Sequence, residues 1–305
     1  MDTPLAMSVT IASAQYPVTF HHGFDAWVQH TENWVRQALA HRPQLLLFPE
    51  YGSMELVSLL PHEERADIQR QVHGMERLRD DFCAVFAGLA ERHGVIIVAP
   101  SFPVCVGDTV FNRCFVFGPT GRMGYQDKYF MTRFEQEEWN VRRAPARLCV
   151  FEAEWGCFGI QICYDIEFPI GAALLCRAGA QVLLAPSCTE TIRGATRVHV
   201  GARARALEQQ CYTVVSPLVG DAPWSAAVDV NYGYAAFYST PDRDLPDEGV
   251  FAQMPAQQTG WLTHSPDLAL IERVRRDGQI LNFRDQAVIG YTVGEQAFRV
   301  VRKVV

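Results

Sequence analysis

The sequence predicts a layered α/β protein whose sheets are not purely parallel. Short apolar runs, typical of strands covered on both faces, alternate with longer segments whose apolar residues recur at helical spacing. Two pairs of these runs are separated only by a short turn, as in β-hairpins, which add antiparallel strands to a parallel sheet. The 305 residues fit one large domain or two modest ones, and no change in composition marks a boundary. We therefore expect one domain over residues 1–305.

The first third of the chain begins with a strand and a covering helix. Residues 8–15 alternate and are rich in Val, Ile and Ala, and residues 24–39 have apolar side chains at helical spacing. The apolar run 45–48 predicts a buried strand that ends at Pro49. Residues 61–93 are polar with helically spaced apolar residues, which predicts one long helix ending before Gly94.

The rest of the chain continues this alternation. Turn-forming segments at residues 119–121 and 154–156 predict two hairpins. Strands are expected at 95–100, 110–117, 122–126, 148–152, 157–162, 182–186, 212–216, 234–239 and near 260–263, and helices at 170–178, 194–209 and 266–276.

Composition and charge exclude several classes of function. The net charge of −7 is spread without a basic block, which argues against nucleic acid or an anionic membrane surface as the main partner. Nine cysteines at irregular spacings, an odd number, indicate reduced thiols and buried packing rather than disulfides. The first fifteen residues show neither a basic region nor a long apolar run, so we expect no signal peptide, no membrane anchor and a cytoplasmic location.

Three polar residues share one context, at the end of an apolar strand-like segment. Glu50 follows LLLFP, Lys128 follows GYQD and Cys163 follows GIQI. Layered α/β folds collect catalytic groups at strand ends. A thiol attacks only as thiolate, so it needs a base to take its proton and a cation to stabilise negative charge. Glu50 is the candidate base and Lys128 the candidate cation.

Each of these residues also has a purely structural interpretation. A single Cys in an apolar strand is more often a packing residue than a nucleophile, and Cys188, at the end of VLLAPS, is a rival on the same grounds. Glu50 also fits a helix cap, and Lys128 an exposed turn charge. The sequence has no C-x-x-C, no H-E-x-x-H, no Gly-rich phosphate loop and no G-x-S-x-G, and its histidines show no ligand spacing. His199 is more typical of a packing residue than of a Cys partner.

Several stretches, taken in order, resemble the nitrilase superfamily of carbon–nitrogen hydrolases. They are IASAQYP, FPE at Glu50, FNRCFVFGPTGRMGYQDK up to Lys128, CYDIEFP from Cys163, GAQVLLAPS, and RARALEQQCYTVVS from Arg203. The resemblance spans nearly the whole chain. It implies a four-layer αββα sandwich, a homodimer or higher homo-oligomer, and chemistry without metal or cofactor. It also implies that residues from about 265 to 305 form an extension that packs on the sandwich or at the dimer interface.

The resemblance also implies a mechanism and a substrate class. Cys163 would attack an amide carbonyl while Glu50 takes its proton, and Lys128 with the backbone N–H of Tyr164 would stabilise the oxyanion. Nitrile-cleaving members usually have Trp and Glu after the Cys, whereas Tyr164 and Asp165 stand here, as in many amidases. We therefore expect a small linear amide as substrate, with nitriles or N-carbamoyl amides as alternatives. A catalytically silent interaction module of the same fold is the alternative of another class.

Further residues follow from the resemblance. A second carboxylate usually lies shortly after the Lys, and in MTRFEQEEWN the best match is Glu135, with Glu137 and Glu138 as alternatives. Asp165 is expected to be a scaffold residue that orients the Cys loop, as are Arg177 and Glu208. The segment after Ser216 departs from the family pattern. Four aromatic residues in it would form a wall of the acyl pocket or pack in the core: Trp224, Tyr232, Tyr234 and Phe237.

Overall fold

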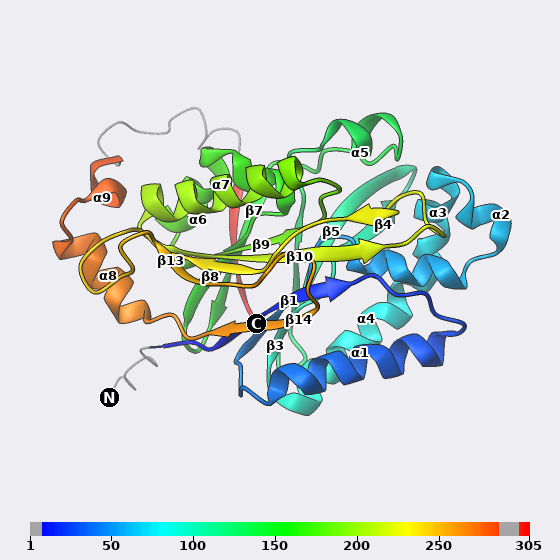
Figure 1. The fold of residues 1–305 in the computed structure, drawn as a ribbon, viewed down its shortest axis with the longest axis horizontal. Helices are drawn as coiled ribbons and strands as arrows, with labels where there is room; N and C mark the ends of the chain where they lie inside the picture. Colours follow the sequence, from blue (N-terminus) through cyan, green and yellow to red (C-terminus); the bar gives the residue numbers. More distant parts are fainter. Residues whose placement is uncertain (1–7, 287–298) are drawn as a thin grey trace.

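The computed structural model describes residues 8–286 and 299–305. It is a stack of strands with helices on its two outer sides (Figure 1). In chain order the elements are β1 (Ile11–Pro17), α1 (Phe24–Leu39), β2 (Leu45–Leu47), the 3₁₀ helix η1 (Gly52–Leu59), α2 (His62–Arg65), α3 (Ile68–Met75), the 3₁₀ turn η2 (Glu76–Leu78), α4 (Arg79–His93), β3 (Ile96–Val98), β4 (Phe102–Val106), β5 (Thr109–Phe117), β6 (Met123–Asp127), α5 (Arg133–Glu137), β7 (Arg147–Ala153), β8 (Gly156–Ile160), the 3₁₀ helix η3 (Cys163–Glu167), α6 (Pro169–Arg177), β9 (Val182–Ser187), α7 (Ile192–Gln209), β10 (Tyr212–Asp221), β11 (Val230–Asn231), β12 (Ala236–Tyr238), β13 (Val250–Gln253), β14 (Gly260–His264), α8 (Leu268–Asp277), α9 (Asn282–Gln286) and β15 (Arg299–Val304).

The strands form two mixed sheets that are joined along one edge. One contains β1, β2 and β3 in parallel, with β14, β5, β4 and β6 added antiparallel. The other contains β8, β9 and β10 in parallel, flanked by β7 and by β12 and β13. β1 and β10 also pair, with Tyr16 opposite Leu218, so the two sheets continue into each other. The expected mixed sheets are confirmed.

Alternating side chains divide the interior into three hydrophobic layers. In β2, Leu45 and Leu47 face a central core, whereas Leu46 faces an outer core shared with α1 and α4. In β9, Val182 and Leu184 face the same central core, and Leu183 faces a second outer core under α6. Because successive strand residues point to opposite faces, this pattern requires two stacked sheets between two helical layers. The four-layer αββα sandwich is thus confirmed (Figure 1).

The predicted long helix over residues 61–93 is wrong, because four shorter elements, α2, α3, η2 and α4, fill this range. A new helix starts after Asp67, whose side chain accepts a hydrogen bond from the backbone N–H of Arg70. The Asp67 backbone is extended, so a helix cannot continue through it and a new helix begins there. β4 was not predicted. It contains Pro103 and lies at one end of the strand order, where a missing N–H is tolerated.

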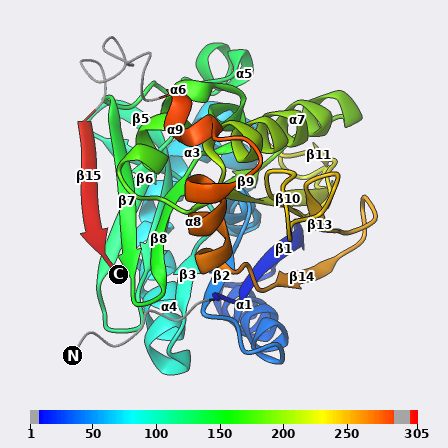
Figure 2. The ribbon, with the colours of Figure 1, turned by 90° about the vertical axis from the view of Figure 1, so that its left-hand side faces the viewer.

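The C-terminal part of the chain covers the other end of the strand order. All six residues of β15 pair in parallel with β7, from Arg299 opposite Arg147 to Val304 opposite Glu152 (Figure 2). α8 contributes Ile271 and Val274 to the central core. The expected extension over about 265–305 thus packs on the sandwich at residues 265–286 and 299–305. Residues 287–298 lie outside the described residues. Whether it also meets a second subunit stays a prediction.

Across residues 8–286 and 299–305, no helix combines the length and the apolar character that a bilayer-spanning segment needs.

Candidate active site

The structure brings the ends of strands from both sheets to one place. Glu50 lies three residues after β2, and Lys128 directly follows β6 in the same sheet. Cys163 begins η3, three residues after the end of β8 in the other sheet. Glu50 and Lys128 are 78 residues apart in the chain, yet the Lys128 Nζ lies 2.7 Å from Glu50 Oε1. Stacking the two sheets therefore creates the cluster that the strand ends predict.

Lys128 joins two carboxylates. Its Nζ also lies 2.7 Å from Glu135 Oε2, and its side chain is only 1% exposed. Glu135 is the third residue of α5, where it forms a capping box with Thr132: its carboxylate accepts from the Thr132 backbone N–H at 3.0 Å. The other two candidate acids, Glu137 and Glu138, are exposed. Of the three acids in this loop, only Glu135 is placed against Lys128.

Asn112 and Tyr51 complete the cluster, and sequence reasoning missed both. The Asn112 amide donates to Glu50 Oε1 at 2.9 Å and to Glu135 Oε1 at 3.2 Å. The Tyr51 hydroxyl donates to Glu135 Oε1 at 2.9 Å. An Asn in the middle of an apolar strand is a sequence signal, because buried strand positions rarely hold an amide without a partner. Tyr51 gave no such signal.

The electrostatics give the two carboxylates different proton affinities. Burial raises the pKa of Glu50, and the nearby Glu135 raises it further, although Lys128 opposes both. Burial also acts on Glu135, but Lys128 and the hydrogen bonds from Thr132 outweigh it and lower the pKa of Glu135 below its ordinary value. Glu135 is thus the carboxylate that favours the ionised form beside Lys128, whereas Glu50 holds a proton more readily than an ordinary carboxylate.

Cys163 has the strained backbone of a residue held in a sharp turn. Its φ of 48° lies in the left-handed region, which a residue with a side chain adopts at a cost. The thiol lies 3.6 Å from the carbonyl oxygen of Cys188, and the backbone N–H of Cys188 donates to Glu50 Oε2 at 3.0 Å. Burial raises the pKa of the Cys163 thiol well above its ordinary value, and the Glu50 charge adds to this. Burial therefore keeps the Cys163 thiol protonated unless a neighbouring base takes its proton.

Asp165 connects the Cys163 turn to the Lys128 loop. Its carboxylate accepts hydrogen bonds from the backbone N–H groups of Phe130 at 2.7 Å, Tyr129 at 3.2 Å and Ile162 at 3.2 Å. Burial raises the pKa of Asp165 to about 7, although the N–H groups of Phe130 and Tyr129 act against it. Tyr164 is the second residue of η3, and the first i to i−3 bond runs from the Asp165 N–H to the Ile162 carbonyl.

The remaining predicted scaffold residues differ in position. Glu208 forms a two-bond ion pair with Arg205 at 2.8 Å, and Arg205 donates to the Ile166 carbonyl in η3 at 3.2 Å. Glu208 therefore acts on the Cys163 turn through Arg205, which sequence reasoning missed. Arg177 is exposed at the end of α6.

The comparisons with known proteins give the family. The profile of the family described as carbon-nitrogen hydrolase matches residues 10–276, which is most of the chain. The chain belongs to the carbon–nitrogen hydrolase family. A probable hydrolase of Bacillus subtilis, YhcX, is 29% identical over 281 residues, which cover 92% of this chain and 54% of that protein. An omega-amidase of Danio rerio is 26% identical over 151 residues, which cover 46% of this chain and 53% of that protein. The chain thus spans about half the length of the curated relatives it matches.

Solved structures agree on the fold. A carbon–nitrogen hydrolase from Helicobacter pylori superposes with a TM-score of 0.77 at 17% identity, covering 94% of this chain and 98% of that one. Nit3 of Saccharomyces cerevisiae, a member of the nitrilase superfamily, gives a TM-score of 0.67 at 20% identity, covering 90% and 96%.

In this carbon–nitrogen hydrolase, the cluster lies in a cavity of about 660 Å³. Glu50, Lys128, Glu135 and Cys163 line it together with Tyr164 and Cys188. None of the four aromatic residues expected as a wall lines the cavity. Their segment contributes other residues, at positions 226, 227 and 229–231. The Tyr234 ring stacks on His199 with 3.7 Å between the ring centroids. Phe237 is buried in the central core, and Trp224 packs on Phe20.

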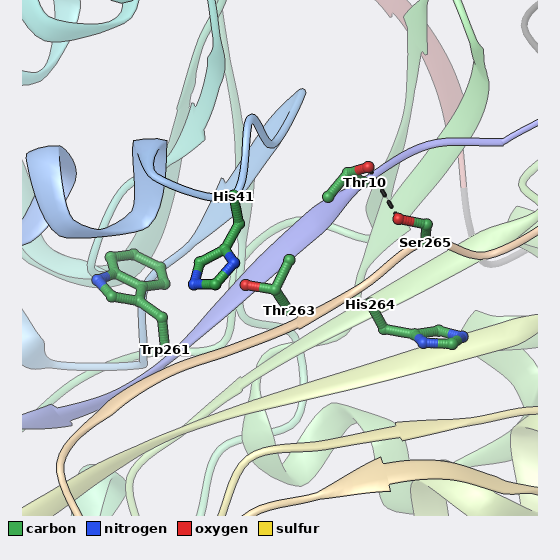
Figure 3. A pocket seen from close by; sticks show the side chains of 6 residues that line it. All are labelled: Thr10, His41, Trp261, Thr263, His264 and Ser265. Carbon is green, nitrogen blue, oxygen red and sulfur yellow. Dashed lines mark hydrogen bonds between the residues drawn. The ribbon is translucent and has the colours of Figure 1, made fainter.

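A second pocket of this carbon–nitrogen hydrolase lies where β1 meets β14 (Figure 3). Among the residues drawn, the hydroxyl oxygens of Thr10 and Ser265 form a hydrogen bond, with 2.9 Å between them. His41 and Thr263 both line the pocket, and the His264 ring packs on Phe251 with 4.5 Å between the ring centroids. The pocket is lined by Thr10, His41, Trp261, Thr263, His264 and Ser265. None of these lining residues has a carboxylate or a thiol side chain. We therefore assign the chemistry to the cavity lined by Glu50, Lys128 and Cys163.

Proposed function

We propose that this protein is a thiol-dependent amidase that hydrolyses a small linear amide to a carboxylic acid and ammonia or an amine. One observation carries the proposal: a buried thiol, a carboxylate of raised pKa and a lysine that is 1% exposed share one cavity. A structural ion pair would not need a thiol beside it. A catalytically silent module would have no use for this set in an accessible cavity.

The first half of the reaction forms an acyl-enzyme. Glu50 takes the proton of the Cys163 thiol, and the sulfur bonds to the amide carbon. The carbonyl oxygen becomes an oxyanion, which the Lys128 ammonium and the Tyr164 N–H stabilise. The oxyanion then returns its electrons, the carbon–nitrogen bond breaks, and Glu50 passes its proton to the leaving nitrogen. A thioester on Cys163 remains.

Water completes the reaction through the same groups. Glu50 takes a proton from water, whose oxygen bonds to the thioester carbon, and the sulfur leaves as thiolate and regains the proton. Glu135 holds the Lys128 ammonium at 2.7 Å and, through Asn112, the Glu50 carboxylate. The raised pKa of Glu50 helps it both to accept and to return the proton.

Amides are favoured over nitriles by two observations. Tyr164 and Asp165 follow the nucleophile, and the Asp165 carboxylate is used to hold the backbone of the Lys128 loop. Relatives of the chain are named amidases, among them the deaminated glutathione amidase of Homo sapiens, 42% identical over 65 residues that cover 21% of this chain and 20% of that protein.

Intact-mass measurement tests the nucleophile. In a solved structure of a Glu-to-Leu mutant of the Nesterenkonia amidase, the acetamide moiety of fluoroacetamide is covalently added to the active-site cysteine. We expect fluoroacetamide to add one acetamide group to this chain, and short linear amides to turn over faster than nitriles or N-carbamoyl compounds.

Cys188 provides a matched control because it lines the same cavity. Cys163→Ala should lose the adduct and at least about a thousandfold in kcat, whereas Cys188→Ala should keep both, since Cys188 contacts Glu50 through its backbone. An adduct that persists in Cys163→Ala would contradict the assignment. Folded wild-type protein without turnover across the whole panel would favour the silent module.

We also propose that the protein is a homodimer that works in the cytoplasm. All nine cysteines are free in the structure, as a reducing compartment requires. The dimer rests on the family resemblance. Light scattering coupled to size-exclusion chromatography should give about twice the monomer mass of 34.3 kDa.

A further inference from the structure

Three side chains that can bind a metal ion meet outside the catalytic cavity. His21 lies in the loop between β1 and α1, His30 in the second turn of α1, and Glu55 in η1. One ligand atom from each lies within 4.8 Å of the other two. In the part of the chain that the structure describes, this is the one group of three or more His, Cys, Asp or Glu with this proximity. The two histidines are nine positions apart, which is not the spacing of a known metal-binding motif.

Each of the two histidines has a buried ring nitrogen that makes no hydrogen bond. His21 is 5% exposed and Glu55 2% exposed. The His21 Nε2 lies 3.3 Å from Glu55 Oε2, but their geometry is not that of a hydrogen bond, and the His30 Nε2 is likewise buried without a hydrogen-bond partner. Buried polar atoms almost always have a partner. A single cation would satisfy both ring nitrogens and the carboxylate beside them.

The carboxylate is oriented as a metal ligand would be. Glu55 Oε1 accepts hydrogen bonds from the Tyr16 hydroxyl at 2.7 Å and the Trp27 indole N–H at 2.8 Å. Oε2 lies 3.3 Å from the His21 Nε2 and also accepts from the backbone N–H of Thr19 at 3.4 Å. Ligating carboxylates are typically held in this way by a second hydrogen-bonded shell. The backbone N–H of His21 donates to Ser58 Oγ at 3.1 Å, which ties the His21 loop to η1.

We propose that His21, His30 and Glu55 bind one divalent transition-metal ion, with Zn²⁺ as the best match. Two imidazoles and a carboxylate suit zinc rather than the all-oxygen sites of Mg²⁺ and Ca²⁺. Tetrahedral zinc with bonds of about 2.0–2.2 Å separates its ligand atoms by about 3.3–3.6 Å. His21 Nε2 and Glu55 Oε2 already have this separation, 3.3 Å. One ring nitrogen of His30 lies within 4.8 Å of the other two ligand atoms and would bind as the third ligand, with water in the fourth position.

An ion pair between His21 and Glu55 is the simpler alternative. It accounts for their proximity but leaves the His30 nitrogen buried and unpartnered. It would also place a second imidazole beside a positive charge, which is unfavourable. A bound metal ion would join the His21 loop, α1 and η1. Because η1 begins two residues after Glu50, the ion would brace the segment that carries the proposed base. The site does not depend on the proposed amidase activity.

Metal binding by the full chain tests the site. Protein treated with a chelator and then equilibrated with ZnCl₂ should retain one Zn²⁺ per chain by elemental analysis. At a hundredfold excess of Zn²⁺ over its Kd, the Tm should rise on the order of 5 °C. Co²⁺ is the second probe. The absorption spectrum of the Co²⁺-bound protein should be that of a metal ion with nitrogen and oxygen ligands. The absence of a thiolate charge-transfer band would exclude binding at the cysteines.

His30→Gln is the decisive variant, because the His30 Nε2 makes no hydrogen bond that the substitution would break. It should fold as the wild type does and bind Zn²⁺ at least about a hundredfold more weakly. Glu55→Gln should weaken binding similarly while still accepting from Tyr16 and Trp27. His22→Gln is the matched control, since His22 is the adjacent, exposed histidine. Zinc retention equal in wild type and His30→Gln, no retention by the wild type, or a thiolate band with Co²⁺ would overturn the proposal.

Discussion

Lys128 shows how a single buried residue sets both stability and chemistry. Its ammonium contacts Glu50 and Glu135, and all three side chains are nearly excluded from water. Burial lowers the pKa of Lys128, but the two carboxylates outweigh this and raise it well above its ordinary value. The lysine therefore stays charged and is a fixed cation next to the thiol, as the stabilisation of an oxyanion requires.

Lys128→Met should therefore damage the fold as well as the reaction. The substitution leaves two buried carboxylates without their cation, which costs about 3–5 kcal/mol of stability, and kcat should fall at least about a hundredfold. Urea unfolding and turnover measure the two effects. Glu135→Gln is the paired variant, because it keeps the shape and one charged pair. It should keep most of the stability but lower turnover, and unchanged activity would place the second carboxylate elsewhere.

Asn112 offers a separate prediction at the residue scale. Its amide donates to both carboxylates, so Asn112→Ala removes two hydrogen bonds to charged groups. One such bond is worth about 1.5–3 kcal/mol, so kcat should fall roughly tenfold to a hundredfold. Steady-state kinetics with circular dichroism as a control for folding measure this. A kcat within twofold of wild type would show that the amide does not position Glu50.

At the scale of elements, α7 is anchored to β12 by a buried histidine. The His199 Nδ1 is 2.8 Å from the Tyr238 hydroxyl, and its ring stacks on Tyr234 with a centroid separation of 3.7 Å. Burial lowers the pKa of His199 to about 4. This position is structural, as the sequence indicated when it gave His199 no catalytic role.

The lowered pKa predicts how stability depends on pH. Between pH 6.5 and about 4 the unfolded chain binds a proton at this residue that the folded chain does not, so stability falls as the pH falls through this window. The loss from pH 7 to 4.5 should be about 2–3 kcal/mol. His264 and Asp165 also titrate differently on folding, so the informative quantity is the difference between wild type and His199→Gln. Urea unfolding of both at the two pH values measures it, and equal losses would contradict the prediction.

At the scale of the whole molecule, the sandwich is closed at one end by the C-terminal strand. β15 occupies the edge of β7 over all six of its residues (Figure 2). Val305 follows it and lies against Gly118, where an added Cβ would come within 2.5 Å of the Val305 backbone. Segments more than 180 residues apart are thus packed without room for a side chain.

Deleting residues 299–305 should lower the Tm and promote aggregation. The deletion exposes the backbone of β7 as an unpaired edge, and such edges pair with other chains. Thermal unfolding monitored by circular dichroism and by light scattering measures both effects. Val304→Ser is the control, because it alters an exposed side chain of β15 and leaves the backbone pairing intact. A Tm equal to that of the control would mean that β7 needs no cover.

The sequence alone determined the alternation of strands and helices, both hairpins, and the strand ends that carry Glu50, Lys128 and Cys163. These features are local. A strand that is buried on both faces consists of a short apolar run, and a polar residue follows where the strand ends. Only the tertiary structure decided that Glu135 rather than its neighbours meets Lys128, that Asn112 joins the two carboxylates, and that His21, His30 and Glu55 converge. Those contacts depend on how the two sheets and their helices stack. The spacing of residues along the chain does not determine the distance between side chains on different elements.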